Sequence, residues 1–103
     1  MVVSYTISKE AGKDWRDIVR YTLDKFGKRQ VQKYTKGLIT CLDELANRKG
    51  HYKEMDVSGY QVLIKRCQKH YIFALVQPDE PLLIIAILHE QMDLMQRLKK
   101  RLS

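Results

Sequence analysis

The sequence predicts one α+β domain in which a helical hairpin packs on a small, mostly antiparallel sheet. Two observations carry this prediction. Two helical patterns follow each other with only a short break between them, and three strand patterns then follow in close succession. The predicted order is β-α-α-β-β-β-α, ending in a C-terminal helix, and residues 1–103 form a single domain.

The N-terminal half contains the hairpin. Residues 2–8 (VVSYTIS) alternate as a strand does, and Ser8 is placed to cap the helix that follows. That helix has apolar residues at three- and four-residue steps and ends at Gly27. A second helix runs from about Lys28 to Asn47. Because the break between the helices allows only a tight reversal, we expect them to be antiparallel, with their apolar stripes turned to a common core.

The C-terminal half supplies most of the sheet. Residues 48–59 contain two glycines and scattered charges, so they are predicted to form the longest loop. Strands are predicted at residues 60–67 and 70–76, where the pattern alternates or is rich in β-formers. Residues 82–88 are apolar throughout, which indicates a strand covered on both faces. The last helix is predicted to start near Glu90.

Composition limits the classes of function. Nineteen basic and 12 acidic residues give a net charge of +7, which favours an anionic partner such as nucleic acid, a ribonucleoprotein or an acidic protein. The alternative is simply a soluble basic surface. No apolar stretch approaches the ~20 residues of a membrane span, and no signal peptide is visible, so a cytoplasmic protein without membrane contact is expected.

The two cysteines, Cys41 and Cys67, lie 26 positions apart in different predicted elements. That spacing favours buried thiols in a reducing compartment over a disulfide. Without clustered histidines, the cysteines also argue against a structural zinc site. We therefore expect neither a metal nor a cofactor.

The first candidate for chemistry is His89-Glu90-x-x-Asp93. Zinc hydrolases use His-Glu-x-x-His, and the aspartate at the fifth position breaks that motif. One interpretation is that His89 and Asp93 lie on one turn of a helix, where Asp93 orients the imidazole. The plainer interpretation, which we weight more heavily, is that the two acids lie near the positive start of a helix.

Two basic regions offer further candidates. Lys65, Arg66, Lys69 and His70 surround a tight strand turn, but alternation places Lys65 and Arg66 on opposite faces and weakens a shared nuclease site. The predicted hairpin carries nine basic and four acidic residues between positions 9 and 36. The default interpretation of these charges is a solvated surface, although an acidic segment of a partner could cover the hairpin.

Several segments resemble the ParE toxins of type II toxin–antitoxin modules, within the RelE/ParE superfamily, and in particular the plasmid-stabilisation ParE toxins. The matching stretches are Ala11-x-x-Asp14-Trp15-x-x-Ile18-x-x-Tyr21, Phe26-Gly27, Gln30-Val-x-x-Tyr34, Arg66-Cys67-x-x-His70-Tyr71-Ile72-Phe73 and Ala86-Ile-Leu-His-Glu-x-Met-Asp-Leu-Met. The last stretch is the most specific, and the resemblance covers nearly the whole chain.

The resemblance implies a toxin that inhibits DNA gyrase and blocks replication, rather than an enzyme. It also implies a ParD antitoxin with an acidic C-terminal segment, which neutralises the toxin in a hetero-oligomer, and operator DNA bound only through the antitoxin. The apolar face of that segment is expected to lie on the hairpin and the neighbouring sheet. The candidate anchors are Trp15, Ile18, Tyr21 and Tyr34.

The gyrase surface is expected on the C-terminal helix, whose polar residues have no evident structural role in the sequence. They are Gln91, Gln96, Arg97, Lys99, Lys100 and Arg101. The alternative function is that of RelE-type members, which cut mRNA on the ribosome with basic residues and a proton-handling side chain. Here only Arg66 and His89 match such a set, which favours gyrase inhibition over RNA cleavage.

Overall fold

The computed structural model describes residues 5–103 and confirms the α+β class. Its elements are β1 (Tyr5–Ile7), α1 (Lys9–Phe26), α2 (Lys28–Ala46), β2 (Lys53–Val57), β3 (Tyr60–Cys67), β4 (His70–Leu75), β5 (Leu82–His89) and α3 (Leu94–Leu102). The order is the predicted one with one additional strand, β2. Residues 2–4 of the predicted first strand lie outside the described residues.

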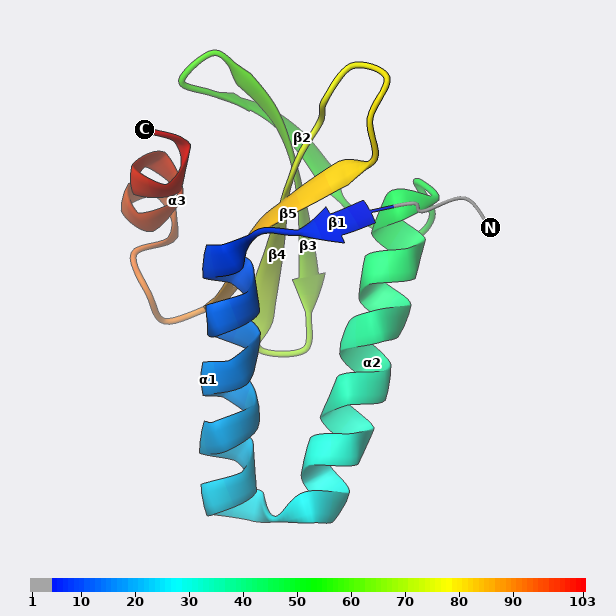
Figure 1. Cartoon of the computed structure of the whole chain (residues 1–103), viewed down its shortest axis with the longest axis vertical. Helices are drawn as coiled ribbons and strands as arrows, with labels where there is room; N and C mark the ends of the chain where they lie inside the picture. Colours follow the sequence, from blue (N-terminus) through cyan, green and yellow to red (C-terminus); the bar gives the residue numbers. More distant parts are fainter. Residues whose placement is uncertain (1–4) are drawn as a thin grey trace.

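The five strands form one sheet in the order β1-β5-β4-β3-β2. β1 pairs parallel with β5, and the other neighbours are antiparallel. The hairpin of α1 and α2 lies against this sheet and extends past its end, with the helical turn at the bottom of the view, while α3 lies at the left of the view, above α1 (Figure 1).

The local signals at the hairpin behave as predicted. The Ser8 hydroxyl accepts a hydrogen bond from the Ala11 N–H at 3.1 Å and so caps α1. Gly27 separates the helices with φ at 87°, a conformation that favours glycine. Its N–H donates to the Leu23 carbonyl while its own carbonyl accepts from the Val31 N–H. One residue therefore ends α1 and begins α2.

Strand β2 contradicts the prediction of a long loop over residues 48–59. It is an edge strand whose first four residues are exposed, so its sequence, KEMDV, shows no alternation of buried and exposed positions. Ser58 and Gly59 form the two-residue turn to β3, with φ of 54° and 85°. Two positive φ values in a two-residue hairpin are typical of a type I′ turn, whose twist matches that of the strands.

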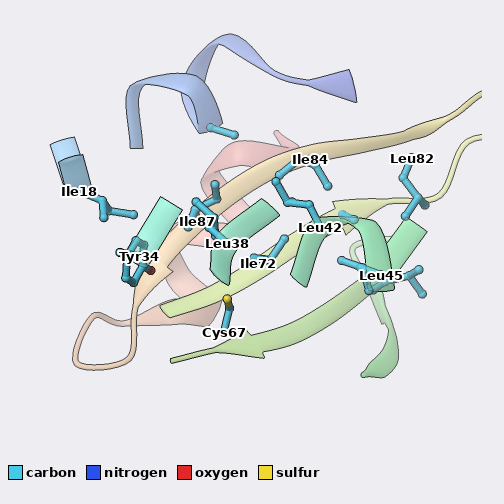
Figure 2. Packing of buried hydrophobic residues seen from close by; sticks show 13 residues of the cluster. Ile18, Tyr34, Leu38, Leu42, Leu45, Cys67, Ile72, Leu82, Ile84 and Ile87 are labelled. Atoms are coloured by element: carbon cyan, nitrogen blue, oxygen red, sulfur yellow. The ribbon is translucent and has the colours of Figure 1, made fainter. Parts of the chain in front are cut away.

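Each face of the sheet has its own apolar core. The hairpin helices cover one face, where Leu38, Leu42 and Leu45 of α2 pack against strand residues such as Ile72 and Ile84 (Figure 2). Helix α3 covers the opposite face through Leu98, which is fully buried with Val62, Phe73, Ala86 and Leu88. β5 is therefore buried from both sides, as its uninterrupted apolar sequence predicted.

The prediction that α3 starts near Glu90 is wrong, because the helix begins at Leu94. The Glu90 N–H donates to the Lys69 carbonyl at 2.9 Å, which extends the pairing of β5 with the neighbouring turn. The Met92 N–H then donates to the His89 carbonyl in a turn. Asp93 is the N-cap, since its side chain accepts from the Gln96 N–H. The acid that caps the helix is thus Asp93 alone.

The prediction of two free thiols is also contradicted. Cys41 on α2 and Cys67 on β3 are joined by a disulfide, with their Cα atoms 6.2 Å apart. That Cα separation lies within the range that a disulfide spans. Sequence spacing alone cannot show this, because the proximity arises only when α2 packs across β3.

Candidate functional site

A groove of about 960 Å³ runs between α1, the start of α2 and the segment that joins β5 to α3. Three exposed apolar side chains line it, namely Tyr21, Phe26 and Met92, which are 60%, 66% and 41% exposed. Cationic side chains, among them Lys13 and Lys69, lie beside them. Large apolar groups at an open groove, beside positive charge, suit an amphipathic acidic segment of another chain.

A row of aromatic side chains forms part of the groove wall. The Tyr34 hydroxyl of α2 lies 2.6 Å from Nδ1 of His70, and the two rings meet edge to face at 5.4 Å. His70 in turn meets His89 edge to face at 5.2 Å, because the two histidines are direct neighbours across β4 and β5. The row thus connects α2 to the C-terminal end of β5.

The surroundings of Tyr34 and His70 keep these two side chains uncharged. Burial and, to a smaller extent, the neighbouring His89 lower the pKa of His70 to about 4, although Glu90 opposes the change. Burial raises the pKa of the Tyr34 hydroxyl to about 12. The Tyr34 hydroxyl therefore keeps its proton. It can donate a hydrogen bond to a ring nitrogen of neutral His70.

This arrangement predicts a loss of stability in mild acid. The folded-state pKa of His70 lies below its unfolded value of 6.5, so the unfolded state takes up a proton first as the pH falls. Stability is then fully present above pH 6.5 and decreases between about 6.5 and 4. Because His70 is only partly buried, we expect the free energy of unfolding to fall by roughly 1–2 kcal/mol, which is less than the full pKa shift implies.

Urea unfolding of the full chain at pH 7.5 and pH 4.5 measures this loss. His70→Gln should remove that part of the pH dependence, whereas His51→Gln, at an exposed histidine, should retain it. An unchanged pH profile in His70→Gln would show that other groups cause the loss.

The two residues of the alternative nuclease site lie on opposite faces of the sheet. Arg66 is paired across the strands with Tyr71, and His89 with His70, so alternation separates Arg66 from His89. The guanidinium of Arg66 forms an ion pair with Glu90 at 2.7 Å and lies 5.9 Å from the Tyr71 ring. His89 Nδ1 accepts from the Gln91 N–H at 3.1 Å. The two side chains therefore do not converge on one substrate.

The predicted basic cluster is divided in the same way. Lys65 is buried beneath α2, where its ammonium donates to the His51 carbonyl at 3.2 Å and lies 3.9 Å from a Glu44 oxygen. Arg66, its neighbour in sequence, is exposed on the other face. The split between these two cations that the sequence predicted is confirmed. The proposed pairing of His89 with Asp93 is not formed, because Asp93 caps α3.

The four predicted antitoxin anchors differ in exposure. Tyr21 is largely exposed in the groove, while Ile18 and Tyr34 line the groove but are 9% and 8% exposed. Trp15 is partly buried against the core beneath the hairpin. Tyr21 is thus the anchor with the largest accessible surface. Phe26 and Met92 also line the groove, and neither was predicted as an anchor. Phe26 offered a signal in the sequence, because it is the last residue of its helix, where a core residue is least expected.

Five of the six predicted gyrase residues are exposed, namely Gln91, Gln96, Arg97, Lys99 and Lys100. Arg101 instead forms a two-pronged ion pair with Asp14 of α1, at 2.9 and 3.0 Å, and donates to the Ile85 carbonyl at 2.8 Å. The same Asp14 carboxylate accepts from the Ile87 N–H at 3.0 Å. The interpretation of Arg101 as a polar residue without a structural role is therefore wrong.

Within residues 5–103, histidine, cysteine and acidic side chains do not gather in groups of three or more that suit a metal ion. None of the helices over the same residues is long and apolar enough to cross a bilayer. The candidate functional surfaces are therefore the groove, with its aromatic row, and the polar side of α3.

Known proteins share this sequence over most of its length. Residues 5–94 match the family described as "ParE toxin of type II toxin-antitoxin system, parDE". The chain therefore belongs to the ParE toxin family of type II toxin–antitoxin systems. It is similar to Toxin ParE of Escherichia coli, with 41% identity over 102 residues that cover 99% of each chain. As a toxin of such a system, it has an antitoxin as its partner.

Proposed function

We propose that this toxin inhibits DNA gyrase in the cytoplasm and so blocks replication, as a stoichiometric inhibitor and not as an enzyme. A ParD-type antitoxin neutralises it, and the complex of the two represses its own operon and stabilises the plasmid that carries it. The chain-long similarity to Toxin ParE is the observation that carries this proposal. The separation of Arg66 from His89 on opposite faces of the sheet favours it over ribosome-dependent mRNA cleavage.

The groove is the proposed binding site for the antitoxin. Its exposed Tyr21, Phe26 and Met92 offer apolar anchors, and Lys13 and Lys69 offer positive charge to an acidic segment. Gln96, Lys99 and Lys100 on the exposed side of α3 are the proposed gyrase contacts, whereas Gln91 and Arg97 of the predicted set line the groove. The two partners are thereby assigned to separate surfaces.

A gyrase cleavage assay tests the proposal. Purified toxin, gyrase, ATP and supercoiled plasmid should yield linear DNA after detergent and protease treatment, and omission of gyrase should abolish it. The triple variant Gln96→Ala/Lys99→Ala/Lys100→Ala should trap roughly tenfold less cleaved DNA, because polar contacts centred in an interface typically contribute 1 kcal/mol or more in total. Unaffected supercoiling at equimolar toxin contradicts the proposal.

The same assay with added cognate antitoxin tests whether the groove binds the antitoxin. Antitoxin should abolish cleavage by the wild-type toxin, whereas Tyr21→Ala/Phe26→Ala should require at least about tenfold more antitoxin, since two exposed aromatic anchors are lost. Ribosomal A-site cuts in mRNA that disappear in Arg66→Ala or His89→Ala would support the alternative function instead.

A further inference from the structure

Seven cationic side chains form two stripes on the helical hairpin. We call this surface the hairpin basic face, and its members are Lys9, Lys13, Arg16 and Arg20 on α1 and Arg29, Lys33 and Lys36 on α2. Within each helix they recur at four- and three-residue steps, which places them on one side of that helix. The two helices lie side by side in the hairpin (Figure 1).

All seven side chains are exposed, and they lie opposite the buried positions of their helices. On α1 the buried residues are Ala11, Ile18 and Thr22, and on α2 they include Leu38 and Leu42. The hairpin basic face therefore points away from the sheet. The groove opens along one side of α1, toward the segment that follows β5, and Lys13 is the member of the face that also lines it.

Little in the molecule neutralises this surface. The ion pairs found within residues 5–103 use the cations Lys65, Arg66 and Arg101, and none belongs to the hairpin basic face. Nine basic and four acidic residues between positions 9 and 36 leave a charge of +5 there, out of +7 for the whole chain. One of those four acids, Asp14, is already engaged by Arg101.

The chemistry of the face suits a polyanion with regularly spaced charges. The stripe from Lys9 to Arg20 is roughly 16 Å long at the rise of an α-helix. Duplex DNA presents one negative charge per ~1.7 Å of its axis, so several phosphates fall within that length. An acidic peptide would also require apolar anchors, and the exposed aromatic anchors Tyr21 and Phe26 lie in the groove.

We propose that the hairpin basic face binds the phosphate backbone of duplex DNA without sequence preference. Sequence recognition at the operator remains with the antitoxin, and the toxin adds phosphate contacts to any nucleoprotein complex that it joins. This inference does not depend on gyrase inhibition.

Fluorescence anisotropy with a 20-base-pair duplex of random sequence tests the inference on the full-length toxin over a series of salt concentrations. The test variant replaces Arg16, Arg20, Lys33 and Lys36 with alanine. The matched control replaces Lys49, Lys53, Lys99 and Lys100, which are also exposed but lie outside the hairpin. Each variant keeps a net charge of +3, which is seven minus four. Circular dichroism melts verify that both are folded.

Wild-type toxin should bind the duplex with an affinity that falls steeply with salt. Because each lost phosphate contact lowers the slope of log affinity against log salt by about 0.9, the hairpin variant should lose about 3–4 units of slope and at least about tenfold in affinity. The control should keep a slope within about one unit of the wild type. Equal losses in both variants, or no duplex binding by the wild type, would overturn the inference. So would tighter binding of a polyglutamate peptide than of the duplex, which would assign the face to an acidic protein.

Discussion

Replacement of Asp14 by alanine should lower the free energy of unfolding by about 3–4 kcal/mol, the largest loss expected from any single polar side chain of this protein. The Asp14 carboxylate holds the Arg101 guanidinium at 2.9 and 3.0 Å and accepts from the Ile87 N–H. Its loss leaves a partly buried cation without its counter-ion and a strand N–H without its acceptor. A small domain has only 5–15 kcal/mol of stability in total, so such a loss is severe.

The topology of the sheet explains why one carboxylate has so large an effect. β1 pairs with β5 only from Leu82 to Ile84, so the remainder of that edge of β5 lacks a neighbouring strand. Asp14 from α1 and Arg101 from α3 satisfy the Ile87 N–H and the Ile85 carbonyl in its place. The pair thereby ties α1 and α3 to β5.

Urea unfolding measures the loss, and Asp17→Ala is the matched control. Asp17 is exposed on the next turn of α1, where substitutions are usually neutral within about 0.5 kcal/mol. Asp14→Asn should fall between the two, because the amide oxygen still accepts from Ile87 while the charge is gone. Equal stabilities of Asp14→Ala and Asp17→Ala would show that the Arg101 contact contributes little.

The sequence was sufficient to predict the elements that have a strong local signal. The Ser8 cap, the reversal at Gly27 and the apolar β5 all follow from residue types at fixed spacing. β2 has no such pattern, because an edge strand exposed on both faces has no reason to alternate. The Ser58-Gly59 turn was the one available signal for it.

The candidate site was predicted less completely, since it depends on packing between elements far apart in the chain. The split of Lys65 from Arg66 follows from alternation alone and is confirmed. By contrast, the contact of Tyr34 with His70, the Cys41–Cys67 disulfide and the Asp14–Arg101 pair each join α1 or α2 to a later segment. Sequence spacing does not encode how helices are placed over a sheet, so these contacts required the structure.

Replacement of Leu98 by alanine is the second change with a large expected effect. Leu98 is fully buried and is the residue through which α3 fills the core on its face of the sheet. Truncation of a buried leucine costs about 2–5 kcal/mol, from lost apolar burial and from the cavity left behind. Met95→Ala is the matched control, because Met95 lies one turn earlier and is 38% exposed. It should cost less than about 1 kcal/mol.

The Leu98 result determines how the gyrase surface of α3 can be tested. Deletion of the chain after Leu94 would remove Leu98 and Arg101 together with the polar side, so lost toxicity would not distinguish a lost contact from a lost fold. We expect Leu98→Ala to weaken gyrase trapping and antitoxin binding together, in proportion to its unfolded fraction at the assay temperature. Gln96→Ala/Lys99→Ala/Lys100→Ala should weaken gyrase trapping alone. If the triple variant also loses antitoxin binding while its melting curve matches the wild type, the two partners share α3 and the proposed separation of their surfaces is wrong.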